Sequence, residues 1–466
     1  MEQHIPGIVL KDGLTQPVFD YKRCLFEKVY VETPVDTDGD GRLDLIAVYI
    51  RRPLETTQGM RVPAIYVANP YMLECNEDWY VPHDVDRDVS PYPQQHITES
   101  DITFDPSTVS FPQPRYPRAT VGYADTAPTE EIPLDCISDW YSYFNSRGYA
   151  SVFCGGLGTR GSQGFNCCGS PEETAAFKAV IDWLNGRCRA FTNLTDNIEI
   201  RADWCTGKVA MSGKSYLGTM CIAVASTGVE GLETIIPEAA ISNWYDYYRC
   251  NGLNLPAIGW QGDDLDILAK YCFSRAKDPE DYASVREAYA AWLEGIAADE
   301  DRDSGNYSRW WDMRNYLKAA DRFKASVFLV HGLADWNVKP THCVNLFAAM
   351  ECRGIPCKMM LHQGGHIYIH DLQGSRFNEM LHLWLDHWLY GIENGAAERI
   401  PNVLVQSNLD QDLWLASPSF PAVKGYTEPV LMPAQESGRL VDDLSATVYD
   451  RTRDNAAEWL AELVLS

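Results

Sequence analysis

The sequence contains few basic residues and no long apolar run. Lys and Arg together number 39 against 65 Asp and Glu residues, which gives a formal net charge of −26 at pH 7. Surfaces that bind nucleic acid or anionic membranes carry the opposite sign, so we expect neither partner. No stretch of about 18 apolar residues occurs, and no charged-then-apolar leader opens the chain, so we expect no membrane span and a cytoplasmic location.

The sequence also lacks paired cysteine motifs. Its 14 cysteines are scattered without a CxxC pair, and only Cys167 and Cys168 are adjacent. Zinc ribbons and redox-active dithiols need such pairs, so the pattern predicts neither a structural metal nor a redox site. We expect reduced thiols, mostly buried as small hydrophobic side chains. Neither a cofactor nor a metal ion is expected.

The sequence does contain a series of short apolar runs that are typical of buried strands. Its composition, 45% hydrophobic and 22% charged, is that of a globular enzyme. Amphipathic helices are predicted at 170–186, with a Ser170 cap and Glu173 three residues later, and at 375–391. Strands alternating with helices predict an α/β fold with a mostly parallel sheet covered on both faces. The strand-like runs are 62–71, the start of 148–164, 207–212, 232–240, 325–332 and 357–363.

The acidic loop PVDTDGDGRLDLI at 34–46 raises the question of calcium. Three aspartates at alternate positions, followed by glycine, resemble the start of a helix-loop-helix calcium site. The twelfth position should be a bidentate glutamate but is Ala47, and the flanks favour strands. We therefore expect a hairpin in which Gly39 and Gly41 take positive φ and the aspartates cap turn N–H groups, with no calcium uptake. A noncatalytic, calcium-dependent binding module is the alternative outside enzymes.

The strongest chemical signal is VAMSGKSYLGTM at 209–220. A serine flanked by glycines, between an apolar strand and a small-residue helix, is typical of a nucleophile elbow, a strained turn that lifts Ser215 Oγ clear of the backbone. The usual pattern is GxSxG, but here the second glycine, Gly218, comes one residue late. On the motif alone, a serine that merely caps a helix after a strand is the alternative.

A nucleophilic serine needs a base and an orienting acid at the ends of later strands, in the order Ser, Asp, His. Asp335 follows the run ASVFLV in the loop HGLADWNV, and His366 follows CKMML in the loop HQGGHIY. A loop aspartate is usually a turn former and a lone histidine is usually structural. The order of the three residues and their strand-end positions nevertheless favour a catalytic triad.

A zinc site is the rival hypothesis for the histidines. His362, His366 and His370 repeat every four residues, and HQGGH has the spacing of the zinc-protease motif HExxH. The two central glycines disfavour the helix that such a site requires, and Gln363 replaces the glutamate base. The sequence therefore favours the triad over zinc.

The motifs GKSYLGTM, HGLADWNVKP and HQGGHIY, in this order, resemble the Xaa-Pro dipeptidyl-peptidase family of serine peptidases, whose wider relatives include cocaine esterase and the α-amino-acid ester hydrolases. The late glycine is normal in that family, as GxSYxG. The resemblance implies an α/β-hydrolase core with a helical cap insertion and the start of a C-terminal β domain of jelly-roll type. The expected regions are the core at 1–242 and 321–396, the cap at 243–320, and an incomplete β-rich region at 397–466.

The resemblance also implies roles for individual residues. Ser215 would be the nucleophile, His366 the general base and acid, and Asp335 its orienting partner. Tyr71 in NPY is similar to the family tyrosine whose hydroxyl donates to the oxyanion, and the backbone N–H of Tyr216 would be the second donor. Two fixed donors suit a tetrahedral acyl intermediate.

The substrate contacts implied by the resemblance lie mainly in the insertion. Trp244, Tyr247 and Tyr248 in NWYDYY offer flat faces suited to a proline ring. Asp263 occupies the place where the family carries an acidic residue, which would hold a free N-terminal ammonium, and Asn337 is a candidate amide contact.

The predicted activity is release of Xaa-Pro dipeptides from peptide N-termini through an acyl-enzyme, with proline-containing peptides as partners. A carboxylic or α-amino-acid ester or acylamide hydrolase of the cocaine-esterase type is the alternative. The sequence leaves open whether the protein forms a homodimer.

Overall fold

The structure, a computed structural model, divides the chain into two compact units. The first is Met1–Phe420 and the second is Pro421–Ser466. The second unit lies outside the described residues, and with it most of the β-rich region expected at 397–466. The structure describes residues 5–76, 81–86, 96–130, 139–250, 252–255 and 262–420.

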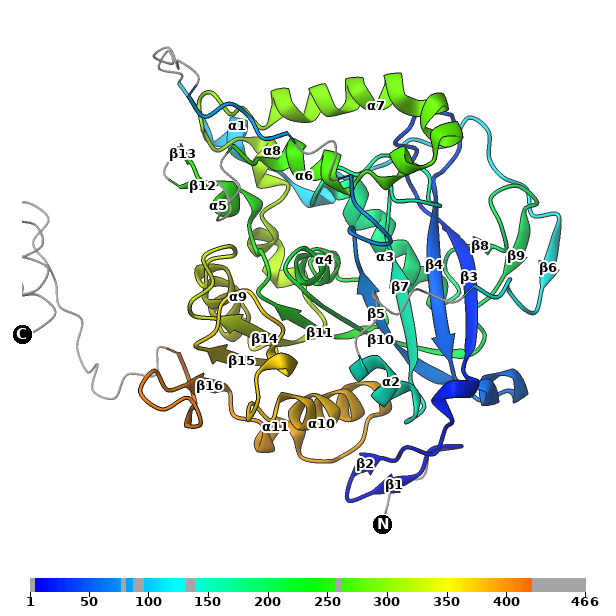
Figure 1. The fold of residues 1–466 in the computed structure, drawn as a ribbon, viewed down its shortest axis with the longest axis vertical. Coiled ribbons are helices and arrows are strands. Elements are labelled where there is room, and N and C mark those ends of the chain that lie inside the picture. The colour runs from blue at the N-terminus through cyan, green and yellow to red at the C-terminus, as the bar shows by residue number, and fades with distance from the viewer. Residues whose placement is uncertain are drawn as a thin grey trace, which may run out of the picture. The chain divides into compact units, whose positions relative to one another are not determined.

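Thirteen strands in these residues form one continuous sheet, in the order β17-β16-β15-β14-β11-β10-β5-β7-β4-β3-β8-β9-β6 (Figure 1). The seven strands from β16 to β7 pair in parallel, which confirms the predicted α/β fold with a mostly parallel sheet. The bounds are β3 (Leu25–Glu32), β4 (Leu45–Arg52), β5 (Val62–Ala68), β6 (Gly122–Ala124), β7 (Ala150–Cys154), β8 (Ala190–Phe191), β9 (Ile198–Ile200), β10 (Cys205–Lys214), β11 (Leu232–Glu238), β14 (Ser326–Gly332), β15 (Cys357–His362), β16 (Val403–Gln406) and β17 (Trp414–Ser417).

The central strands end together at one edge of the sheet. Lys214, the last residue of β10, is in register with Glu238, the last residue of β11. Further along the same edge, Gly332 at the end of β14 pairs with His362 at the end of β15. Because parallel strands bring their carboxyl ends to one edge, the loops after β10, β14 and β15 meet there.

Two apolar cores cover the two faces of the sheet. One contains buried side chains of α3 (Pro171–Leu184), α4 (Tyr216–Ala225) and α9 (Thr341–Glu351), and the other contains those of α2 (Asp139–Asn145) and α10 (Phe377–Tyr390). Along β4, Val48 points into the first core and its neighbour Tyr49 into the second. Side chains alternate in this way along a strand, so an apolar run buried on both faces becomes a central strand.

The segment expected as a helical insertion, 243–320, holds α5 (Trp244–Tyr248), α6 (Leu265–Cys272), α7 (Pro279–Asp299) and α8 (Arg309–Asp312). It also holds a small hairpin of β12 (Arg249–Cys250) and β13 (Leu253–Asn254). Helix α7 runs along the top of the view in Figure 1. The side chain of Asp278 accepts from the N–H groups of Glu280 and Asp281, and Pro279 opens this helix, which is the expected chemistry of a helix start. None of the helices in the described part of the chain is both long and apolar enough to cross a membrane.

The core sheet continues beyond residue 397, where we expected a second domain to begin. Strand β16 pairs in parallel with β15, and β17 then pairs antiparallel with β16. The first compact unit therefore ends at Phe420 rather than near 397. A short β-like run after a helix does not reveal which sheet it joins, because the pairing partner is chosen by tertiary packing.

The acidic loop connects β3 to β4 as a hairpin, as its sequence predicts. Gly39 and Gly41 have φ of 75° and 88°, and their N–H groups donate to the two carboxylate oxygens of Asp36 at 2.9 Å each. Arg275 donates to Asp38 at 2.9 Å. The carboxylates thus accept from turn N–H groups and form an ion pair, which accounts for aspartates at these positions of the hairpin.

Candidate active site

Ser215 lies at the junction of β10 and α4, in a backbone conformation that residues other than glycine rarely adopt. Its φ is 63° and its ψ is −128°. The Ser215 N–H donates to the carbonyl oxygen of Glu238, and the Ser215 carbonyl accepts from the N–H of Thr219, both at 2.8 Å. Such strain costs on the order of 1–3 kcal/mol and persists only where the surroundings fix it. The turn therefore has the geometry of a nucleophile elbow.

The two glycines around Ser215 are required by close packing. A Cβ at Gly213 would lie 2.4 Å from Leu217 Cβ, and a Cβ at Gly218 would lie 2.6 Å from the carbonyl oxygen of Gly213. Neither position can accept a side chain without moving backbone atoms. The late second glycine is thus set by the contact between the end of β10 and the first turn of α4.

Asp335 and His366 form a hydrogen-bonded pair at the ends of β14 and β15. His366 Nδ1 lies 2.7 Å from Asp335 Oδ2. The other oxygen of this buried carboxylate accepts from the N–H groups of Asn337 and Val338 at 3.0 Å each. Both carboxylate oxygens are therefore engaged, which fixes the plane of the carboxylate and, through it, the imidazole.

Lys214 connects the loop after β15, which carries His366 and is called the histidine loop below, to the elbow at Ser215. Its Nζ donates to the carbonyl oxygen of His366 at 3.2 Å. The hydrogen bonds of the described residues include none between Ser215 Oγ and His366 Nε2. In unliganded enzymes this contact is often long and tightens only with substrate, so the strand-end geometry remains suited to a Ser-His-Asp triad.

Among the described residues, the three histidines of the zinc hypothesis are not a group whose donor atoms lie close enough together to hold one metal ion. Burial lowers the pKa of His362 to about 4, and its Nδ1 accepts from the N–H of Gly364 at 3.1 Å. Burial also lowers the pKa of His370. Two other clusters in the described residues have donor atoms close enough for a metal: His83 with Asp266 and Glu300, and Asp36 with Asp38 and Asp40.

The two residues that were predicted to supply the oxyanion donors are in contact through their rings. Tyr216 is the first residue of α4, so its N–H has no acceptor within the helix. The ring of Tyr71 packs edge-on against that of Tyr216, with centroids 5.8 Å apart. Burial raises the pKa of Tyr71 well above its ordinary value, so its hydroxyl keeps its proton and can donate.

Sequence reasoning identified Glu173 only as a helix-cap residue and missed its second role. Its carboxylate accepts from the N–H of Gly169 and from the hydroxyl of Tyr216. Burial raises the pKa of Glu173 to about 7. The only signal in the sequence was its place three residues after Ser170, which accounts for the cap but not for a contact with the elbow.

The predicted substrate aromatics gather on α5, beside the elbow. Trp244 packs edge-on against Tyr216 with centroids 5.1 Å apart, and Tyr247 and Tyr248 form a T-shaped pair at 4.6 Å. Trp244 is 0% exposed, and its ring N–H donates to the hydroxyl of Tyr316. It therefore supports the other aromatic side chains of α5 from within the core. Tyr247, at 7% exposed, retains more surface than its neighbours.

Asn337 and Asp263 also lie among these aromatics. The Tyr247 hydroxyl donates to Asn337 Oδ1 at 2.7 Å, which joins the insertion to the Asp335 loop. Burial raises the pKa of Tyr248, and the nearby negative charge of Asp263 raises it further. The buried Asp263 carboxylate therefore lies close to the aromatic side chains of α5. All five predicted substrate residues are thus in one region.

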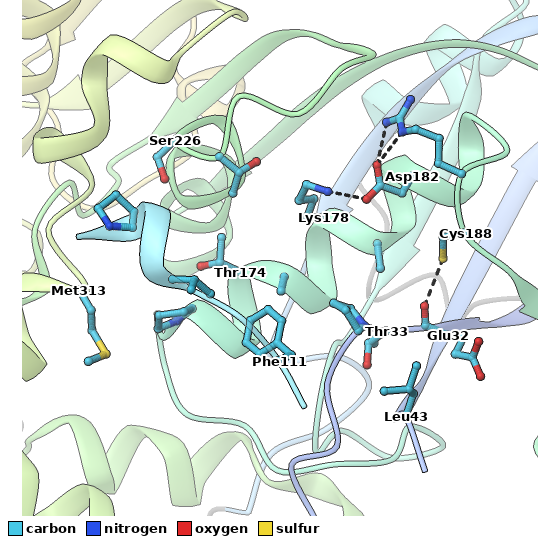
Figure 2. Close-up of a pocket in the computed structure, with 18 of the residues that line it drawn as sticks. Glu32, Thr33, Leu43, Phe111, Thr174, Lys178, Asp182, Cys188, Ser226 and Met313 are labelled. Carbon is cyan, nitrogen blue, oxygen red and sulfur yellow. Dashed lines mark hydrogen bonds and ion pairs between the residues drawn. The ribbon is translucent and has the colours of Figure 1, made fainter. Parts of the chain in front are cut away.

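A large surface hollow lies elsewhere on the molecule. Its volume is ≈ 610 Å³, and it is lined by residues of α3 such as Lys178 and Asp182 and by Ser226 (Figure 2). Ser226 follows the C-terminal end of α4, whereas Ser215 precedes its N-terminal end. A helix of ten residues is about 15 Å long, so this hollow is separate from the elbow.

The fold and the elbow define the class of the protein. A CocE/NonD family hydrolase from Staphylococcus aureus has a similar fold, with a TM-score of 0.50 and 13% identity over 87% of this chain and 63% of that protein. Together with the parallel sheet and the strained turn after β10, this likeness shows an α/β-hydrolase-like fold.

Residues 38–368 match the family described as X-Pro dipeptidyl-peptidase (S15 family), and the chain belongs to this family. It is 40% identical to a Xaa-Pro dipeptidyl-peptidase of Pediococcus pentosaceus over 97% of its length and 41% identical to one of Lactiplantibacillus plantarum over 97%. It spans 57% of the length of each of these relatives.

Proposed function

We propose that this protein is a serine peptidase that releases Xaa-Pro dipeptides from the N-termini of peptides. Two relatives about 40% identical to it are named Xaa-Pro dipeptidyl-peptidase. The observation that carries the proposal is the hydrogen bond of 2.7 Å between His366 and Asp335, in the loops that meet at the strained turn of Ser215. This arrangement suits acyl transfer from a peptide to serine.

In the first half of the reaction, Ser215 Oγ attacks the carbonyl carbon of the proline residue while His366 Nε2 accepts its proton. Asp335 holds the Nδ1–H of His366 and stabilises the imidazolium that forms. The tetrahedral oxyanion accepts from the Tyr71 hydroxyl and the Tyr216 N–H. When the C–N bond breaks, His366 returns the proton to the leaving amine and the dipeptide remains esterified to Ser215.

In the second half, water replaces the leaving amine. His366 takes a proton from the water, whose oxygen attacks the ester carbonyl, and the same two donors hold the second oxyanion. Collapse of this intermediate breaks the bond to Ser215 Oγ, which receives the proton from His366. The free dipeptide leaves and the enzyme returns to its starting state.

Specificity for proline and for a free N-terminus would come from the insertion. Of the α5 aromatics, Tyr247 retains exposed surface and would supply the flat apolar face for the pyrrolidine ring, whereas Trp244 and Tyr248 are buried and pack against it. Asp263 would pair with the substrate ammonium two residues from the cleaved bond, because a charge-assisted hydrogen bond to a buried carboxylate is strong. This arrangement predicts a preference for unblocked substrates.

A panel of chromogenic substrates tests this function. Gly-Pro-p-nitroanilide should be cleaved, whereas Ala-Ala and acetyl-Gly-Pro anilides should react far more slowly, and Ser215→Ala should cleave none of them. Turnover of short esters or amino-acid esters with inert Gly-Pro anilide would instead favour the ester-hydrolase alternative. Full activity of Ser215→Ala would contradict the serine mechanism itself.

We also propose that the enzyme works in a reducing compartment such as the cytoplasm and has no nucleic-acid partner. Several thiols are buried, and burial raises the pKa of Cys24 and of Cys205 to about 11, which suits stable reduced cysteines. Size-exclusion chromatography with light scattering would show whether the protein forms the dimer that the sequence leaves open.

A further inference from the structure

Glu238 contacts both the elbow and the histidine loop. It is the last residue of β11 and is 4% exposed. Its backbone carbonyl accepts from the N–H of Ser215 at 2.8 Å, and its side-chain Oε2 accepts from the N–H of Ile369 at 2.8 Å. Ile369 begins a short 3₁₀ helix three residues after His366, so its buried N–H has no acceptor within the helix and depends on Glu238.

Lys214 holds the other end of the same segment. It precedes Ser215 in the chain and is in register with Glu238 across the sheet. Its Nζ donates to the carbonyl of His366 at 3.2 Å and lies 5.0 Å from the centroid of the Tyr368 ring. The segment His366–Ile369 is therefore bound at its first carbonyl and its last N–H by two residues that adjoin the nucleophile.

The charges around Glu238 come from three elements. Burial raises its pKa most, the Ile369 N–H and the Lys214 cation lower it, and the carboxylate of Asp371 raises it, which together bring the pKa to about 8. Tyr368 and Tyr141 also face it, and both phenols have raised pKa values and stay neutral. Glu238 is thus the group in this contact that changes charge at mildly alkaline pH.

We propose that Lys214 and Glu238 are positioning residues that clamp the segment His366–Ile369 onto the elbow and so fix the His366 imidazole relative to Ser215. The inference rests on the proposed serine-hydrolase function but not on its substrate. Asp335 orients the His366 ring, whereas the clamp fixes the backbone from which that ring extends. A displacement of about 1 Å at a reacting group can cost on the order of 10²-fold in rate, so such a contact matters for catalysis.

Labelling of Ser215 by a fluorophosphonate is the readout, because it needs an activated serine and no peptide specificity. Glu238→Ala should lower the labelling rate and the kcat per titrated serine at least about tenfold with little change in KM. Glu238→Gln keeps an acceptor oxygen for Ile369 and should restore both to within a few-fold. Glu233→Ala, at the opposite end of β11, is the matched control and should behave as wild type.

The pH profile separates positioning from a merely structural role. An ionised carboxylate accepts a stronger hydrogen bond than a neutral one, so the clamp tightens as Glu238 loses its proton. The wild-type labelling rate should therefore show an extra rise through pH about 8, the value to which burial raises the pKa of Glu238, and Glu238→Gln should lack it. Lys214→Met should slow labelling, and Lys214→Arg should recover part of the loss.

Two results would overturn the clamp. One is a Glu238→Ala protein that labels at the wild-type rate per titrated serine and differs only in melting temperature. If Glu238→Ala does not fold, the second overturning result is a labelling rate of Glu238→Gln that depends on pH in the same way as that of wild type. If wild-type protein is labelled normally but cleaves no Xaa-Pro anilide, only the proposed substrate is wrong. The labelling rates of the variants then still test the clamp.

Discussion

The hydroxyl of Tyr216 lies 2.7 Å and 2.9 Å from the two carboxylate oxygens of Glu173 and donates to this buried side chain. The same tyrosine supplies the N–H that we propose as an oxyanion donor. Glu173 belongs to α3 and Tyr216 opens α4, so the contact joins two helices directly beneath the elbow. The first turn of α4 is therefore held from outside the helix as well as by its own hydrogen bonds.

Glu173 should make stability depend on pH. Burial raises its pKa from 4.5 to about 7, so between these values the folded protein holds a proton that the unfolded chain has released. This contribution, on the order of 3 kcal/mol, is fully present below pH 4.5 and is lost as the pH rises through 7. Glu173→Gln has no such proton, so its free energy of unfolding should fall less from pH about 5 to 8 in urea titrations. Glu172→Gln should match wild type.

Tyr71→Phe should lower kcat on the order of 10²- to 10³-fold with little change in KM, because one of the two proposed oxyanion donors is lost. In the proposed mechanism the hydroxyl donates to charge that develops only in the transition state, so substrate binding should be spared. Initial rates with Gly-Pro-p-nitroanilide give both constants. Tyr123→Phe removes an exposed hydroxyl and serves as the control. An unchanged kcat in Tyr71→Phe would remove this tyrosine from the oxyanion hole.

Asp335→Asn should lower kcat on the order of 10³- to 10⁴-fold. The carboxylate accepts three N–H groups, from His366, Asn337 and Val338, and an amide group would turn a donor toward at least one of them. His366 would then adopt the wrong tautomer for a base. Fluorophosphonate labelling should slow in parallel, while Asp125→Asn on the surface should have no effect. Labelling at the wild-type rate would show that Asp335 does not orient the base.

Ser215→Gly should be inactive but more stable than Ser215→Ala. Both variants lose the nucleophile, and only glycine relieves the strain of φ 63° and ψ −128°. The expected difference in the free energy of unfolding is on the order of 1 kcal/mol, measured by urea denaturation of the two variants side by side. Equal stability would mean that the turn is not strained.

Calcium should leave the melting temperature unchanged. The two oxygens of Asp36 already accept the N–H groups of Gly39 and Gly41, and Asp38 pairs with Arg275. An ion would have to displace these partners. Thermal melts with excess Ca²⁺ and with a chelator provide the test, and a clear rise with Ca²⁺ would show that the aspartates do bind the ion.

Sequence reasoning succeeded where local chemistry dictates structure. The glycines around Ser215 are needed because a Cβ would strike backbone or neighbouring side chains, so this constraint appears directly as residue identity. The apolar runs that became β10, β14 and β15 are buried on both faces and could not be polar. The positions of Asp335 and His366 then follow from the ends of these strands.

Long-range partners could not be derived in the same way. Glu173 is typical of a helix start, and nothing near it in the sequence indicates Tyr216. Glu238 ends an apolar strand, and its partner Ile369 lies far along the chain. Both contacts depend on how packed elements meet, which periodicity does not encode. The same limit explains why β16 was assigned to a separate domain.

The order of these residues along the chain bears on how the protein is synthesised. The turn at Ser215 is closed by Glu238, which follows after a single helix, whereas Asp335 and His366 come only after the insertion and further strands. A chain growing from the ribosome can therefore form the turn before the residues that activate it exist. Under the proposed mechanism, Ser215 would therefore stay inert in the growing chain until β15 and the loop that carries His366 join the sheet.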